Sequence, residues 1–148
     1  MNYDKAQKEV FNALLRGDRV CGYKFDDDHF FVTADGYKGY IFPNNLIQFN
    51  TEKVNIINPF ANMSEPIPEN ELKLTLEFRA EDHTKGKMYR RLKADGKNVY
   101  VNDKFLQCFQ NARFYQKQDE PHGLITVTER LNPRGKDLPV GVVLPIKI

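Results

Sequence analysis

Length, composition and charge set the first limits on this chain. With 148 residues it fits one domain, residues 1–148, and a chain of this size buries roughly 68–70% of its unfolded surface. The net charge of +2 is much weaker than that of a dedicated DNA-binding domain, and no apolar run is long enough to cross a bilayer. The two cysteines, Cys21 and Cys108, are too few for a disulfide framework. We therefore expect a cytoplasmic protein with reduced thiols and no membrane contact.

The first half of the chain, residues 1–57, begins with a predicted helix. Ala6, Val10 and Ala13 recur at helical spacing within residues 4–16, and Gly17 is a typical helix end. Strands are predicted over the apolar segments that follow, which are separated by Asp-rich, Asp-Gly and Asn-containing turns. Their ranges are 19–25, 29–34, 37–42 and 54–57.

Residues 58–70 contain three prolines and few strand formers, so we expect them to form a crossing loop. The second half, residues 71–148, opens with apolar and polar residues in alternation over 72–78, the pattern of a half-buried strand. Its predicted partner is a strand over 87–94, and a further strand over 97–101 follows an Asp-Gly turn.

The end of the chain is predicted to be a helix followed by three strands. Asn102 is suited to cap a helix over residues 102–112. The apolar residues of this segment share one side at helical spacing, namely Phe105, Leu106, Phe109 and Ala112. Segments rich in β-branched or aromatic residues predict strands over 113–117, 123–129 and 138–148. With the preceding strand, the order is β-α-β-β-β.

The two ends of the chain show a weak internal repeat. Asp4-Lys5 and Asn12-Ala13 recur as Asp103-Lys104 and Asn111-Ala112 at a constant offset of 99 residues. Such a repeat predicts a duplicated unit, and the alternative is an unrelated domain that uses two similar helices to cover one sheet. The predicted fold is a single α+β domain of two β-α-β-β-β-like halves, with two helices packed on an antiparallel sheet.

The last residues and the predicted helix before them resemble the end of a bacterial DNA polymerase sliding clamp, the β subunit. These last residues are Val142-Val143-Leu144-Pro145-Ile146-Lys147-Ile148. The resemblance covers residues 98–148 best and the N-terminal part loosely. It implies a DNA-clamp-like fold whose helices face duplex DNA, a homo-oligomeric ring, and an apolar groove for short peptides of partner proteins. The chain departs from the family in having the length of a single clamp domain.

Basic residues are concentrated in the second half. Residues 1–70 carry seven Lys or Arg and ten Asp or Glu, a balance of −3, whereas residues 71–148 carry fifteen and ten, a balance of +5. Lys and Arg neutralise phosphates, and an interleaved Tyr89 would stack on a base. The candidate DNA contacts on the predicted hairpin and helices are Lys5, Lys8, Lys85, Lys87, Arg90, Arg91, Lys93, Lys104 and Gln107. The alternative is an exposed sheet edge whose lysines only prevent aggregation.

The terminal strand supplies candidates for the peptide groove, because side chains of a strand alternate between core and surface. As the clamp resemblance implies, they are Val142, Val143, Leu144, Pro145, Ile146 and Lys147. In the alternative interpretation these residues complete the sheet.

No catalytic, metal or cofactor site is predicted. His29, His83 and His122 lack zinc-ligand spacing, and the three aspartates at residues 26–28 lack the glycine of a calcium loop. The first functional hypothesis is a non-enzymatic, sliding clamp-like protein that associates weakly, without sequence preference, with duplex DNA or replication-type partners. The alternatives are a protein-interaction or regulatory domain that keeps the fold without DNA, and an enzyme whose site is assembled from remote residues.

Overall fold

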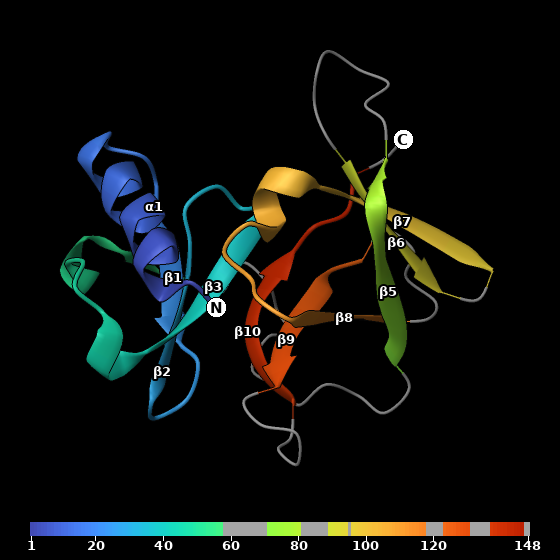
Figure 1. The fold of residues 1–148 in the computed structure, drawn as a ribbon. Coiled ribbons are helices and arrows are strands. Elements are labelled where there is room, and N and C mark those ends of the chain that lie inside the picture. The colour runs from blue at the N-terminus through green and yellow to red at the C-terminus, as the bar shows by residue number, and fades with distance from the viewer. Residues whose placement is uncertain (58–70, 81–88, 95, 118–122, 131–136, 147–148) are drawn as a thin grey trace.

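The computed structural model describes residues 1–57, 71–80, 89–94, 96–117, 123–130 and 137–146, with side chains for all of these except 71–80, 94, 130 and 137. Within these ranges the chain forms one α-helix, three short 3-10 helices and ten strands (Figure 1). The helices are α1 (Tyr3–Leu15), η1 (Asn44–Leu46), η2 (Thr51–Lys53) and η3 (Asp103–Leu106). The strands are β1 (Cys21–Lys24), β2 (His29–Thr33), β3 (Lys38–Pro43), β4 (Asn55–Ile56), β5 (Glu71–Ala80), β6 (Tyr89–Ala94), β7 (Lys97–Asn102), β8 (Ala112–Lys117), β9 (Ile125–Arg130) and β10 (Asp137–Val143).

The ten strands form a sheet in the order β4-β1-β2-β3-β10-β9-β8-β5-β6-β7. β4 runs parallel to β1, and the other neighbouring strands are antiparallel, so the sheet is mixed. β3 pairs with β10, with Tyr40 opposite Gly141 and Gly39 opposite Val142. This seam joins the N-terminal strands to the C-terminal strands.

The last six strands of this order, β10 to β7, curl around a common core (Figure 1). A bridge between Tyr100 on β7 and Ile146 after β10 brings the two ends of the curled part together. The Ile146 N–H donates to the Tyr100 carbonyl at 2.7 Å. The core of this part consists of Leu92, Val99, Val101, Phe114, Ile125, Val127, Val140 and Val143. It is filled mainly by β-branched residues, which pack well on a pleated surface.

The helix α1 packs beside β1, β2 and β3 (Figure 1). Its first turn is capped by Asn2, whose Oδ1 accepts from the Lys5 N–H, and Gly17 at a φ of 78° ends it. The apolar residues that pack together in this second core are Ala6, Val10, Ala13, Val20, Val32, Tyr40, Phe42, Phe49, Val54 and Cys108. The first predicted helix is therefore confirmed.

The second predicted helix, over residues 102–112, is wrong. Asn102 does cap a turn, because its Oδ1 accepts from the Lys104 N–H at 3.1 Å, but the turn is the short 3-10 helix η3. In an α-helix the Gln110 N–H would donate to the carbonyl four residues earlier. It donates instead to Glu129 Oε1 at 2.9 Å. A tertiary hydrogen bond thus replaces the helical one.

The predicted duplication and the two-helix, clamp-like architecture are wrong for the same reason. The Cys108 carbonyl, which a longer helix would offer to residue 112, accepts from the Asn2 N–H at 2.7 Å. Asn111 has a φ of 47°, and Ala112 begins β8. Val10 in α1 therefore has no helical counterpart at Phe109. Across the described ranges, the fold is largely β, with a mixed sheet and one α-helix.

Most predicted strands are confirmed. The predicted pair over 72–78 and 87–94 is the hairpin β5–β6, and Leu76 lies opposite Leu92 in it. The terminal strand ends at Val143, earlier than predicted. The predicted loop 58–70 lies outside the described residues. No helix in the described part of the chain is long and apolar enough to cross a membrane.

Candidate nucleic-acid interface

Two segments 102 residues apart in the chain meet on one basic surface. The Lys5 Nζ donates to Gln107 Oε1 at 3.1 Å, which joins α1 to the residue that follows η3. Lys8 lies one helical turn from Lys5, Lys104 lies in η3, and both side chains are exposed. We call Lys5, Lys8, Lys104 and Gln107 the lysine surface. α1 and the η3 segment carry these four predicted DNA contacts, and the hydrogen bond between Lys5 and Gln107 joins the two segments.

A polar cluster holds the chain after η3 against α1 and β3. The Tyr40 hydroxyl donates to Glu9 Oε2 at 2.6 Å and lies 3.4 Å from Cys108 Sγ. The Cys108 Sγ lies 3.6 Å from Glu9 Oε1, and Lys38 Nζ forms an ion pair with Glu9 Oε2 at 3.0 Å. We call Glu9, Lys38, Tyr40 and Cys108 the Glu9 cluster. Because Gln107 directly precedes Cys108, this cluster fixes Gln107 on the lysine surface.

Burial decides the chemistry of the Glu9 cluster. Burial raises the pKa of the Cys108 thiol, and the Glu9 carboxylate adds to the effect, whereas the contact with Tyr40 opposes it. Burial also raises the pKa of the Tyr40 phenol, and the hydrogen bonds to Cys108 and Glu9 reinforce this shift. A reactive cysteine requires a lowered pKa and access to solvent. The contacts of the cluster position the chain, and burial lowers the reactivity of its thiol.

We expect the Cys108 thiol to react with a disulfide reagent only when the protein unfolds. The thiolate is the reacting species, and a raised pKa together with 1% exposure keeps it scarce and inaccessible. The measurement is the modification rate of the Cys21→Ser variant with and without urea. The Cys108→Ser variant retains the half-exposed Cys21 and should react while folded. Equal rates for Cys108 in the folded and unfolded protein would contradict this expectation.

An aromatic pair lies beside the lysine surface. Tyr37 in the turn before β3 and Phe105 in η3 have stacked rings, with centroids 6.3 Å apart and planes at 11°. The Lys38 Nζ lies 5.5 Å from the centroid of the Phe105 ring. Tyr37 is 59% exposed, whereas Phe105 is half-buried. Sequence reasoning missed Tyr37, whose one signal is the Asp-Gly turn directly before it.

The predicted DNA contacts on β6 lie away from α1 in Figure 1. Arg90 Nε lies 2.8 Å from Asp103 Oδ1, so Arg90 stabilises the start of η3. Arg91 and Lys93 are exposed. Tyr89, which was predicted to stack on a base, is buried at 8% exposure. The remaining hairpin candidates, Lys85 and Lys87, lie outside the described residues.

The predicted groove residues divide between core and surface. Val142 and Val143 are fully buried in two different apolar clusters, on opposite faces of β10. The next three residues, Leu144, Pro145 and Ile146, are half-exposed. Lys147 lies outside the described residues. The peptide groove stays a prediction, and the half-exposed residues are the ones that a peptide would reach.

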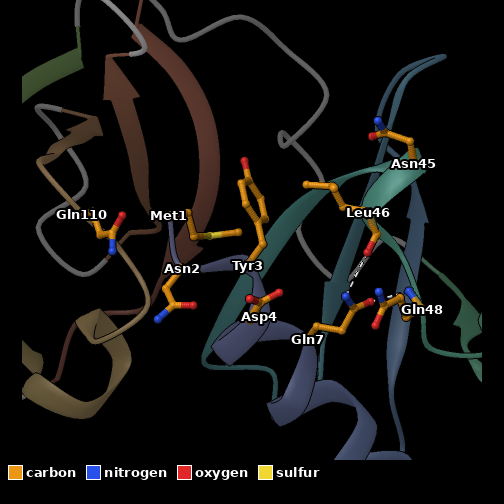
Figure 2. A pocket seen from close by; sticks show the side chains of 9 residues that line it. All are labelled: Met1, Asn2, Tyr3, Asp4, Gln7, Asn45, Leu46, Gln48 and Gln110. Atoms are coloured by element: carbon orange, nitrogen blue, oxygen red, sulfur yellow. Dashed lines mark hydrogen bonds between the residues drawn. The ribbon is translucent and has the colours of Figure 1, made fainter.

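An open cleft of about 550 Å³ lies beside the N-terminal end of α1, and Figure 2 shows the side chains that line it. Its lining residues are Met1, Asn2, Tyr3, Asp4, Gln7, Asn45, Leu46, Gln48 and Gln110. The Gln7 side chain is fixed in the wall, since its Nε2 donates to the Leu46 carbonyl at 2.8 Å and its Oε1 accepts from the Gln48 N–H. Neutral amides dominate the cleft, which suits hydrogen bonding better than acid–base chemistry. Sequence patterns missed these residues, because amides on a helix or in a loop are typical of solvent exposure.

In the described part of the chain, no three His, Cys, Asp or Glu side chains come together in a group that could hold a metal ion. The His29 Nδ1 lies 2.8 Å from Asp26 Oδ1, and this contact ties the turn between β1 and β2. His83 and His122 lie outside the described residues.

Comparison with known proteins identifies no relative. No family model, no curated protein and no solved structure matches this chain. The resemblance to sliding clamps stays a prediction that these comparisons do not test. Functional proposals for this chain therefore rest on its own surface chemistry.

Proposed function

We propose that this protein is a non-enzymatic binding protein that associates with nucleic acid through the lysine surface, without reading the sequence. The observation that supports the proposal is the contact between Lys5 and Gln107, which makes one basic surface from two remote segments. Lys8 and Lys104 extend this surface, and both are exposed. Ammonium groups spaced over a surface neutralise phosphates and release counterions whatever the bases are.

The number of charges limits the strength of such binding. Three lysines neutralise about three phosphates, which gives weak binding that falls steeply as the salt concentration rises. The Glu9 carboxylate is paired with Lys38, so it opposes the approach of a phosphate less than an unpaired carboxylate would. This proposal places the protein in the cytoplasm, where nucleic acid is accessible.

The triple variant Lys5→Glu, Lys8→Glu, Lys104→Glu is expected to lose detectable binding to a labelled duplex. The unmodified protein should bind at about 20 mM salt, with a slope of about −3 in log K against log salt. Fluorescence anisotropy over a salt series measures both quantities. Because the three side chains are exposed, the variant should keep its melting temperature within a few degrees.

The matched control changes the same net charge elsewhere on the molecule. The variant Arg19→Glu, Lys24→Glu, Lys53→Glu alters three exposed residues at the β1–β4 side of the sheet, which lie before β1, in β1 and in η2 just before β4. It should bind more tightly than the first variant at equal total charge. Equal losses in both variants would show that only the overall charge matters. Absence of binding by the unmodified protein at low salt would contradict the proposal and favour a protein-interaction role.

A further inference from the structure

We propose that the lysine surface prefers single-stranded over double-stranded nucleic acid, because one base stacks on the exposed ring of Tyr37. This inference rests on the nucleic-acid binding proposed above. Tyr37 is 59% exposed, yet its ring is not an isolated surface group, since it stacks on Phe105 with the planes at 11°. Because the centroids lie 6.3 Å apart, the two parallel rings are offset and meet only at their edges, and the exposed part of the Tyr37 ring is available to a base. Every base has an aromatic face, so such stacking is tolerant of sequence.

The backbone that carries Tyr37 is held in place before any ligand arrives. Asp35 Oδ1 accepts from the Tyr37 N–H at 2.8 Å and from the Lys38 N–H at 3.1 Å. The Tyr37 carbonyl accepts from the Leu144 N–H at 2.7 Å, which ties the turn to the residue after β10. Gly36 adopts a φ of 76°, which the turn requires and which L side chains rarely adopt. With the backbone fixed in this way, only the side-chain torsions of Tyr37 remain to be ordered when a base stacks on its ring.

The aromatic pair is continuous with the lysine surface. Phe105 and Lys104 are neighbours in η3, and Gln107, two residues after Phe105, contacts Lys5 on α1. Lys38, next to Tyr37, lies over the Phe105 ring. A strand with one base on Tyr37 would therefore have its phosphates within the field of the lysines along η3 and α1. In a duplex the bases are paired and stacked on each other, so they cannot reach the Tyr37 ring.

Three ligands of equal length test this inference: an oligodeoxyuridylate, an oligouridylate that differs from it only in the 2′-hydroxyl, and a mixed-sequence DNA duplex, each measured by anisotropy at about 20 mM salt. Both single strands should bind the unmodified protein more tightly than the duplex does. The Tyr37→Ala variant should bind single strands roughly five- to a hundredfold more weakly, the range expected for loss of one base–aromatic stack. Its affinity for the duplex should be unchanged. Tyr37→Phe keeps the ring and should retain the affinity for single strands.

The outcomes separate this inference from the proposed function. No binding to any of the three ligands overturns both. Duplex binding that equals or exceeds single-strand binding, or a Tyr37→Ala variant that binds single strands like the unmodified protein, overturns only the inference. Tighter binding of either single strand than of the duplex, with the loss in Tyr37→Ala, supports it, and the tighter of the two identifies DNA or RNA as the ligand. Thermal melts of both variants should match that of the unmodified protein, since Tyr37 is exposed.

Discussion

Replacing Phe42 by alanine is expected to lower the free energy of unfolding by about 3–5 kcal/mol. Phe42 is fully buried, and its ring lies 5.6 Å from that of Phe49 and 6.1 Å from those of Tyr3 and Tyr40, measured between centroids. These partners come from α1, from β3 itself and from the loop before η2. Loss of the ring removes the apolar contact that holds these elements together and leaves a cavity that they can fill only in part. Urea unfolding followed by circular dichroism measures the change.

The matched control is Phe11→Ala, which deletes the same side chain from the solvent side of α1. Phe11 is 51% exposed, so the loss should be well below that of Phe42→Ala. The difference between the two variants isolates burial, because both remove one phenyl ring. If both substitutions cost the same, the packing of α1 on the sheet would differ from that in the structure.

Sequence patterns predict the elements of this fold whose stabilising contacts are local. The helix α1 was predictable because the apolar stripe of Ala6, Val10 and Ala13 and the glycine that ends the helix are read directly from the sequence. The hairpin β5–β6 was predictable because apolar and polar residues alternate over residues 72–78 of the sequence. The helix over 102–112 failed because the backbone partners of Cys108 and Gln110 come from remote parts of the chain. The apolar residues of this segment do have helical spacing, but tertiary hydrogen bonds take the place of the backbone hydrogen bonds that an α-helix needs.

The exposure of Lys104 and Gln107 does not depend on the type of helix that precedes or carries them. Phe105 and Leu106 pack against the core of the curled sheet, which leaves Lys104 and Gln107 exposed whether the turn is α-helical or 3-10. The pairing of Gln107 with Lys5 did not follow from the sequence, because no local pattern encodes a contact across 102 residues. Sequence patterns missed Tyr37 for the same reason, because its contact with Phe105 is also between residues far apart in the chain.

The lysine surface depends on how closely β3 and β10 approach each other. Lys5 belongs to the N-terminal part, and Lys104 and Gln107 belong to the C-terminal part. The strands β3 and β10 provide the backbone pairing between these parts. Glycine stands on both sides of this seam, as Gly39 on β3 and Gly141 on β10. Where two backbones approach this closely, there is no room for a Cβ atom between them.

Replacing Gly141 by alanine is therefore expected to destabilise the protein by about 3 kcal/mol, the upper part of the range for overpacking a filled core. The added Cβ would lie 2.4 Å from the Gly39 carbonyl oxygen and 2.8 Å from the Phe109 ring. The first of these neighbours is backbone in a paired strand, so it cannot move without disturbing the β3–β10 register. Urea unfolding of the variant gives the loss of stability. The control on the same strand is Leu138→Ala, which changes a side chain that is 43% exposed and should cost much less. A Gly141→Ala variant as stable as the unmodified protein would show that β3 and β10 are farther apart than this seam requires.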